Sequence, residues 1–528
     1  MRPNQYKQKS AKIDWPLFTA TSGFIVIFCT LAAINMQLLS NIVDKGFNLA
    51  HRFFGLFWQW ELLINFIVSL IICCLPGSRA TLGNINKPEF SFPQWTAMIM
   101  CTLLAGGGVF WAACEPLAHF VSPPPLFNLS GHNSQVISAA LAQSYLHWGF
   151  LGWAIFGSTS TIVFMYYHYE KGLPLAPRLL LYPLLGKRAI HGLWGIIADA
   201  ACIISAVAGT VGVIGFIGLQ VSYGLNLLLN VPNNFSTHAT IVTVIVSLYT
   251  LSAVSGLKRG VKILSEINIL MVIFLLIFML IAGPTTFIFK HFLTGQSVYY
   301  KYFFSMALFR DNSGIFGSQV WLSTWTVFFW AWCIGNGPVM AMFISKISRG
   351  RSIRSIIFVL AILSPIVTNF WFTILGGSGI AFELQHAGSI STVLNESSFP
   401  AVLFAITQQY PFGFALSIAF IVLTIIFVAT TGDSMTYMIS VTLSINGEAS
   451  TIIRVFWGLS MGLMSIILIA VSAGSIDKLQ SFIVITAVPV SLILAPSIWD
   501  AVRITLKKEN SITKKNKKTR PRKIKAIG

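Results

Sequence analysis

Several tryptophans of this sequence stand in the middle of long apolar segments, where an aromatic ring could bind a ligand. In "HWGFLGWAIF" (147–156), helical geometry of about 100° per residue puts Trp148, Trp153 and Phe156 on one broad face. The faces of such rings attract a cation that has lost its water, by about 2 kcal/mol for each good contact. The stretch therefore predicts one wall of a cage for a cationic group.

A second aromatic stretch combines tryptophan with residues that break helices. In "FFWAWCIGNGPVM" (328–340), Trp332 and Asn336 are four residues apart and share a helical face. Three helix breakers surround Asn336: Gly335, Gly337 and Pro338. Irregular backbone inside a membrane is tolerated only where protein or a watered cavity surrounds it. The stretch therefore predicts an interrupted helix beside a buried binding site.

A similar interruption comes earlier in the chain. In "LLAGGGVFWAACEP" (103–116), Gly106, Gly107 and Gly108 precede Trp111. Unwound backbone at such a point can present N–H groups to an anion and C=O groups to a cation. The alternative is that the glycines only allow helices to pack closely. Two interruptions in one chain favour the binding site.

Composition places these stretches in a membrane protein. The chain has 528 residues, of which 55% are hydrophobic and 10% charged, and a mean hydropathy of +0.76. Soluble domains carry about 25% charged residues. The apolar runs are too long for β-barrel strands, and the first is too long for a cleavable signal peptide. We predict twelve helical spans: 15–36, 54–75, 95–115, 141–168, 192–225, 239–256, 263–289, 320–346, 355–380, 412–442, 452–474 and 479–501.

The two interruptions fall in the third and eighth predicted spans, which cross the membrane in opposite directions. Interrupted helices at matching positions of two oppositely oriented units are typical of inverted-repeat transporters. A channel, the alternative from a different class, would more often carry a ring-forming filter and fewer spans. An enzyme is disfavoured, because only His147 among the histidines adjoins a span and no HxxxH or paired-carboxylate motif is present. The sequence favours a secondary transporter.

The positive charge is distributed unevenly between the two sides of the membrane. Of the 35 Lys and Arg residues, 29 fall on the side that holds both termini. This asymmetry marks the cytoplasmic side and predicts that both termini are cytoplasmic. The net charge of +19 therefore does not indicate a nucleic-acid partner.

The seven cysteines fall within predicted spans and at no metal-binding spacing, so we expect no structural disulfide. They are Cys29, Cys73, Cys74, Cys101, Cys114, Cys202 and Cys333.

These segments resemble the betaine/carnitine/choline transporter family over roughly residues 15–500. The resemblance rests on five blocks: "FWAACEPLAHF" (110–120), "HWGFLGWAIF" (147–156), "KGLPLAPRLLLYPLLG" (171–186), "WTVFFWAWCIGNGPVMAMFISKISRGRSIR" (325–354) and "TTGDSMTY" (430–437). It implies an all-α protein of the cell (inner) membrane with a LeuT-like fold, usually assembled as a homotrimer, that carries quaternary-ammonium compounds.

The resemblance also implies how the chain is divided. We expect a cytoplasmic N-terminal tail (1–14), two peripheral helices (15–94), a first five-helix repeat (95–289), an extracellular or periplasmic connection (290–319), a second inverted repeat (320–502) and a basic cytoplasmic tail (503–528).

Carried over by motif, the resemblance implies an aromatic box that holds the ammonium head. The matching positions are Trp111, Trp148, Trp153, Phe156, Trp332 and Cys333. Two positions depart from the family: Phe156 stands where betaine carriers usually have Tyr, and Cys333 where a second Trp is common. With fewer rings, the box should bind trimethylammonium more weakly or accept a different head group. An ammonium cation also suits a site for which we expect no membrane carboxylate as partner.

For coupling, the sodium-dependent branch of the family places two hydroxyl residues against carbonyls of the broken third span. Thr430 and Thr431 match them, Phe427 lies on the same face, and Leu104 would supply a carbonyl. The alternative is that each threonine bonds to its own i−4 carbonyl. A second sodium position of this branch would fall at Ala206 and Thr210 and is doubtful.

Two other coupling modes occur in the family. The sodium-independent antiporters carry an Arg where this chain has Asn268, and the proton-coupled choline carriers carry an Asp where it has Gly107. Both departures favour Na⁺ symport, with Na⁺ as coupling ion and no other cofactor.

Charged residues in or near the spans are further candidates. Glu115 and Asp433 could be functional or could pair with polar neighbours, and Asp199 reads as a cap or interfacial charge. Residues 507–528 of the basic tail are expected to form a disordered end that anionic membrane lipids attract.

Overall fold

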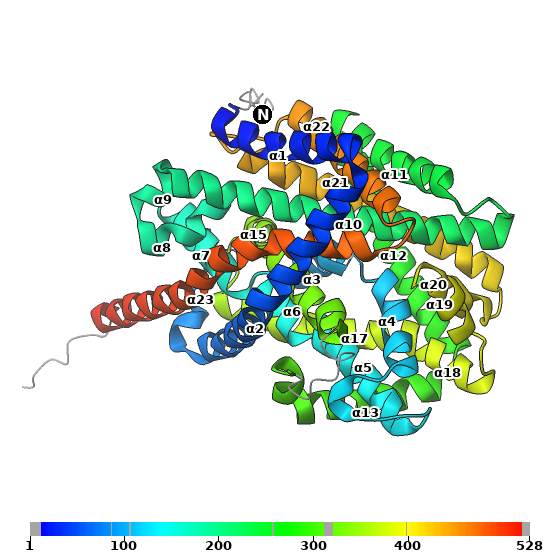
Figure 1. Cartoon of the computed structure of the whole chain (residues 1–528). Coiled ribbons are helices and arrows are strands. Elements are labelled where there is room, and N and C mark those ends of the chain that lie inside the picture. Colours follow the sequence, from blue (N-terminus) through cyan, green and yellow to red (C-terminus); the bar gives the residue numbers. More distant parts are fainter. Residues whose placement is uncertain are drawn as a thin grey trace, which may run out of the picture.

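The computed structural model describes residues 12–85, 87–104, 107–255, 258–310, 320–397 and 399–519, which form helices joined by loops (Figure 1). Within these described residues, ten helices are long and apolar enough to cross a membrane: Trp15–Ile34 (α1), Met36–Cys74 (α2), Ser134–Glu170 (α5 to η3), Leu193–Leu229 (α10), Phe235–Val254 (in α11), Val320–Ile347 (ending in α15), Ile353–Gln385 (α16 to α18), Gly413–Thr442 (α21), Thr451–Val471 (α22) and Asp477–Asn510 (in α23). The chain is a multi-pass membrane protein, as predicted.

Two of the twelve predicted spans do not appear among these ten helices. The third, 95–115, is divided between α3 (Phe92–Leu104) and α4 (Phe110–Val121), so the interruption predicted there is confirmed. The seventh, 263–289, ends at a bend of 105° between Ile267–Ala282 of α12 and α13 (Thr285–Ala307), and this pair would make an eleventh crossing.

The interruption predicted in the eighth span is wrong. Helix α15 runs from Phe328 to Ile347 without a break. A Cβ on Gly335 would lie 2.4 Å from Ser205 Oγ of α10, and one on Gly337 would lie 3.1 Å from Leu494 of α23. These glycines therefore let neighbouring helices approach closely, which is the alternative weighed above.

The fourth predicted span carries two breaks that the sequence analysis missed. It is divided into three helices: α5 (Ser134–Trp148), α6 (Phe150–Ile155) and α7 (Ser158–Met165). Gly149 and Gly157 stand at the two junctions. A Cβ at Gly149 would lie 2.2 Å from the Tyr145 carbonyl oxygen, so a larger residue would not fit this backbone. The aromatic residues of this segment therefore project from a jointed helix.

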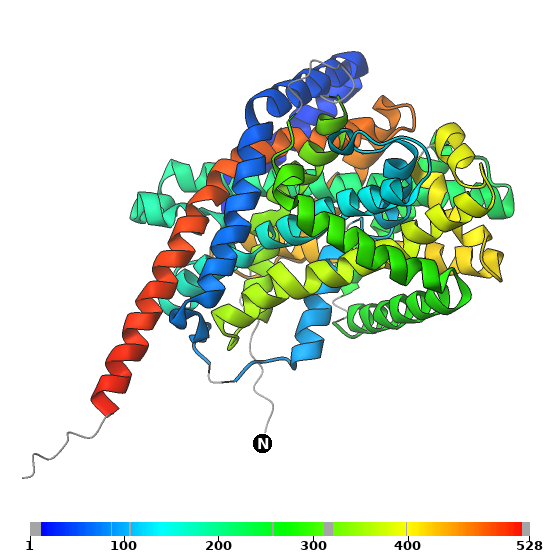
Figure 2. The same cartoon turned by 90° about the horizontal axis from the view of Figure 1, so that it is seen from below.

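Helix α15 lies at the centre of the molecule, packed against α7, α10 and α23. Figures 1 and 2 show α23 running beside α2 and extending beyond the other helices. Helix α23 spans Asp477–Thr519. The disorder expected for residues 507–528 is therefore wrong as far as Thr519, because the helix continues to that residue. In the C-terminal part of α23, Lys508 Nζ lies 2.5 Å from Glu170 Oε1 and Arg503 donates to Tyr167 Oη at 2.6 Å.

Helix α13 packs along α5. Ser138 Oγ and Thr294 Oγ1 are 3.0 Å apart, and the Phe150 N–H donates to Tyr299 Oη at 3.3 Å. The stretch 290–319, expected as a connection, therefore begins within a packed helix.

Candidate functional site

A buried cavity of about 40 Å³ lies where α5, α10, α15 and α21 meet. Its lining residues are His147, Trp148, Phe156, Gly209, Thr210, Val213, Phe329, Trp332, Cys333, Asn336, Met340, Thr431 and Met435. A cavity of this volume holds a few water molecules. An organic ammonium compound is larger, so its binding requires side chains to move apart.

Two predicted tryptophans form a corner of this cavity. Trp148 and Trp332 meet edge to face, with ring centroids 5.7 Å apart and ring planes at 84°. Phe329 completes the corner, with its centroid 5.4 Å from Trp148 and 6.3 Å from Trp332. Phe329 was not predicted, although it lies three residues before Trp332 and so shares its helical face. Three aromatic rings thus converge on one small cavity.

The structure brings six of the predicted site residues to the cavity and leaves others behind its wall. The six are Trp148, Phe156, Trp332, Cys333, Asn336 and Thr431. Trp111 is fully buried and packs on Phe329 at 5.1 Å between centroids, so it supports the corner from outside. Trp153 donates its indole N–H to Thr368 Oγ1 at 3.0 Å and lies 6.4 Å from the ring of Phe156.

The glycine turn between α3 and α4 lies behind the cavity wall, against Trp332. A Cβ on Gly107 would lie 2.5 Å from Cη2 of Trp332 and 3.1 Å from Cδ1 of Trp111. The Gly108 carbonyl accepts a hydrogen bond of 2.7 Å from the indole N–H of Trp371. Gly106, with the side chain of Leu104, lies outside the described residues.

Of the threonines proposed for sodium, Thr431 makes the i−4 bond that was the alternative interpretation, and Thr430 bonds to the carbonyl three residues before it. Both Thr430 and Thr431 donate their hydroxyls to the Phe427 carbonyl, at 2.9 Å. Since the protons point to that carbonyl, the lone pairs of both hydroxyl oxygens stay free for a hard cation such as Na⁺. Thr431 lines the cavity. The residues therefore fit a sodium ligand set in chemical type.

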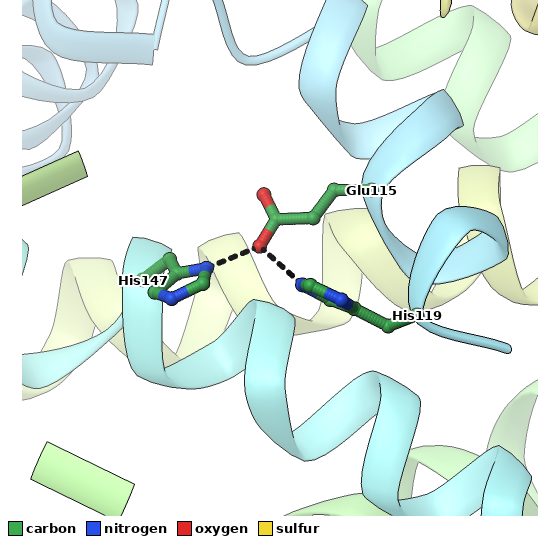
Figure 3. Close-up of side chains that lie close together, drawn as sticks. All are labelled: Glu115, His119 and His147. Carbon is green, nitrogen blue, oxygen red and sulfur yellow. Dashed lines mark hydrogen bonds and ion pairs between the residues drawn. The ribbon is translucent and has the colours of Figure 1, made fainter. Parts of the chain in front are cut away.

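A buried carboxylate stands behind the aromatic corner, contrary to the expectation of none. Figure 3 shows Glu115 between His147 and His119. Glu115 Oε1 lies 2.6 Å from His147 Nδ1 and 3.4 Å from His119 Nε2, and Oε2 accepts the indole N–H of Trp148 at 2.8 Å. All three residues of the cluster are almost completely buried. The carboxylate is thus hydrogen-bonded to His147 and Trp148, two residues that line the cavity.

The sequence carried signals for this cluster that were read differently. Glu115 and His119 are four residues apart, the spacing that places side chains on one helical face. His119 was assigned to a segment end, but it lies inside α4 and is fully buried. His147 directly precedes Trp148, so the sequence also placed it next to the predicted aromatic face.

Two other acids in the bundle, Asp199 and Asp433, are paired with arginines. Asp199 lies 2.5 Å from Arg178 Nε and also accepts the Arg178 backbone N–H at 2.6 Å. Asp433 pairs with Arg454. Asp199 is therefore a buried ion-pair partner and not the cap or interfacial charge that was expected. Asp433 has the pairing that was one of its two interpretations.

The helical bundle and its aromatic cavity define a membrane transporter. The model of the family BCCT, betaine/carnitine/choline family transporter, matches residues 16–510. The chain belongs to this family.

Named relatives are transporters as well. The chain is 48% identical over 493 residues to glycine betaine transporter 2 of Vibrio parahaemolyticus, covering 93% of this chain and 90% of that protein. It is 28% identical over 502 residues to the high-affinity choline transport protein of Escherichia coli, covering 93% and 72%. It is 28% identical over 500 residues to the ectoine/hydroxyectoine transporter of Virgibacillus pantothenticus, covering 94% and 97%. These names confirm that the chain is a transporter and not an enzyme.

Proposed function

We propose that this transporter imports a compound with a quaternary-ammonium head, with glycine betaine as the first candidate, by alternating access. The observation that carries the proposal is the edge-to-face pair of Trp148 and Trp332 at the wall of a buried cavity. Two indole faces at a right angle can attract one cation from two sides. The 48% identity to a glycine betaine transporter supports the same cargo.

Within this site, Trp148, Trp332 and Phe329 form the cage, and Phe156 and Cys333 set its size. Asn336 offers a polar group, because its Nδ2 donates to the Trp332 carbonyl at 3.2 Å while Oδ1 has no partner among the described residues. The lining residues are supported from outside the cavity by Trp111, Trp153, Gly107 and Gly108.

For coupling, we favour Na⁺ symport through one site, with Thr430 and Thr431 as side-chain ligands beside Phe427 and a carbonyl at Leu104. The second sodium position is disfavoured, because Ala206, the residue at one of its two positions, has no side-chain oxygen. Sodium-independent antiport and proton coupling are the alternatives within the family.

For architecture, we propose twelve crossings, with α3 and α4 together as the third and the bent α12–α13 pair holding the seventh. The first two helices would be peripheral to two inverted five-helix repeats (95–289 and 320–502). We further propose the cell (inner) membrane, cytoplasmic termini, a homotrimer, and anionic lipid near the basic end of α23.

The decisive experiment is uptake into proteoliposomes that hold the purified protein. Labelled glycine betaine, choline, carnitine and ectoine are supplied outside, with Na⁺ or K⁺. We expect saturable, concentrative uptake of at least one ammonium compound, lost in Trp332→Ala and retained in the control Trp60→Ala, whose ring is exposed on α2. Uptake of none of them would overturn the proposal, and flux that neither saturates nor concentrates its solute would indicate a channel.

A further inference from the structure

Behind the aromatic corner, Glu115 is completely buried and receives hydrogen bonds from two cavity-lining residues. We propose that Glu115 is the counter-charge of the cargo: its carboxylate stays ionised, and the cationic head in the cavity compensates that charge across Trp148 and His147. This inference rests on the proposed function and adds the charge class that the site selects.

The protons around His147 support an ionised carboxylate. His147 Nε2 lies 3.0 Å from Gln143 Nε2, an amide donor, and 3.0 Å from the Thr326 hydroxyl. Nε2 is therefore assigned as the acceptor, which places the ring proton on Nδ1. Nδ1 then donates to Glu115 Oε1 at 2.6 Å from a neutral ring.

The second oxygen of the carboxylate is bound in the same manner. Trp148 donates its indole N–H to Oε2 at 2.8 Å. Two donated hydrogen bonds favour the charged form of a carboxyl group. Within the described part of the chain, the ion-pair contacts of Glu115 are with His119 and His147, and none is with a lysine or arginine.

A buried carboxylate without a cation is costly, because hydrogen bonds from neutral donors replace only part of its hydration. The adjoining cavity is the place where a cation would reduce that cost. A head group over the Trp148 ring would stand on the order of 8 Å from the carboxylate, given a ring contact within about 6 Å. At this distance the attraction through protein is still substantial.

The Glu115 carboxylate also strengthens the attraction for a cation through the Trp148 indole itself. A ring whose N–H donates to an anion gains electron density on its faces, and the negative face is what attracts the cation. Trp148 holds both contacts at once, because its N–H points to Glu115 while the ring lines the cavity. Glu115 is thus a positioning residue that also carries charge.

The same cluster has the composition of a metal site. Glu115, His119 and His147 each offer one ligand atom, and these three atoms lie within 4.8 Å of one another. A divalent cation there would neutralise the carboxylate and repel an ammonium head across Trp148. Removing the Glu115 charge should therefore weaken binding of an ammonium compound if Glu115 is the counter-charge of the cargo. It should strengthen that binding if the cluster holds a metal ion.

The test compares three ligands of similar shape and different charge in the full-length protein. They are choline, a net cation; glycine betaine, a zwitterion; and the neutral carbon isostere of choline, in which a tert-butyl group replaces the trimethylammonium. Binding to wild type and Glu115→Gln is measured by displacement of labelled glycine betaine. The amide keeps an acceptor for the Trp148 N–H and removes the charge. Glu61→Gln is the matched control, because Glu61 is a buried membrane carboxylate that does not line the cavity.

We expect Glu115→Gln to weaken choline binding by on the order of tenfold or more, glycine betaine binding by about threefold, and isostere binding hardly at all. Glu61→Gln should leave the ratios unchanged. If Glu115→Gln does not insert, Trp148→Phe should lower the choline-to-isostere ratio while the isostere still binds.

Equal loss for all three ligands would overturn the proposal, because it would show a structural role. A stoichiometric transition metal in the purified protein that is lost in Glu115→Gln would overturn it too. A wild type that binds no ammonium compound would instead defeat the proposed function itself.

Discussion

Gly107 touches the tip of Trp332: a Cβ at this glycine would lie 2.5 Å from Cη2 of the indole. The turn between α3 and α4 is therefore in contact with the cage ring that projects from α15. Because an indole is rigid, any side chain at position 107 must turn the whole ring.

We accordingly expect Gly107→Ala to weaken binding of glycine betaine about tenfold, because the displaced ring loses its contact with the cation. Adding Trp332→Phe, which shortens the ring, should recover part of the loss. The control is Gly23→Ala, since a Cβ on Gly23 meets nothing within 4 Å. Titration calorimetry on the purified protein measures each affinity. Equal affinities in wild type and Gly107→Ala would place Trp332 outside the binding site.

The sodium proposal predicts an ion-specific effect at Thr431. Thr431→Ala removes an oxygen at the cavity wall and should raise the Na⁺ concentration for half-maximal uptake about tenfold, whereas Thr431→Ser should stay near wild type. Thr424→Ala is the control, because Thr424 bonds to the Phe420 carbonyl on the same helix and does not line the cavity. Uptake that runs undiminished in K⁺ medium would contradict Na⁺ coupling altogether.

Cys333 is the lining residue whose environment can be measured directly. Its Sγ lies at the cavity beside Gly152, 3.3 Å from where a Cβ of that glycine would stand. Saturating glycine betaine should slow alkylation of Cys333 at least several-fold. Cys74, which is exposed on α2, should react at the same rate with and without cargo. Mass spectrometry resolves the two sites, and cargo-independent labelling of Cys333 would remove it from the binding site.

The close packing of α15 predicts a stability effect. Gly335→Ala would put its methyl group 2.4 Å from Ser205 Oγ and should lower the free energy of unfolding by about 1–3 kcal/mol. Ser205→Ala in the same chain should restore much of it, because the nearest remaining atoms, Ser205 Cβ and Ala487 Cβ, are 3.6 Å away. Thermal unfolding in detergent measures both, and a double variant no more stable than Gly335→Ala would refute the contact.

Sequence reasoning located most of the aromatic wall from helical spacing, but it also placed Trp153 on the face of Trp148 and Phe156, whereas Trp153 lies behind the wall. Trp148, Phe156, Trp332 and Asn336 needed no knowledge of neighbouring helices. The same reasoning misjudged Gly335, because a glycine that breaks a helix and one that admits another helix look identical in one sequence. At Gly149, the clash with the Tyr145 carbonyl that makes glycine necessary exists only in the folded backbone.

The Glu115 cluster was missed for a different physical reason. Its members come from α4 and α5, and a hydrogen bond between two helices depends on how those helices cross. The partner of the Trp148 indole N–H, Glu115, lies outside its own segment. Pairings of this kind, like that of Asp199 with Arg178, require the tertiary structure.

Helix α23 has a practical consequence for measurement. Its 43 residues make a rod about 65 Å long at about 1.5 Å per residue, against a hydrocarbon core of about 30 Å. At the usual tilt of about 20°, much of the rod stands clear of the bilayer. A fluorophore attached near Thr519 would therefore sit on a helix that continues from the bundle, and its polarisation would report how that helix tilts during a transport cycle.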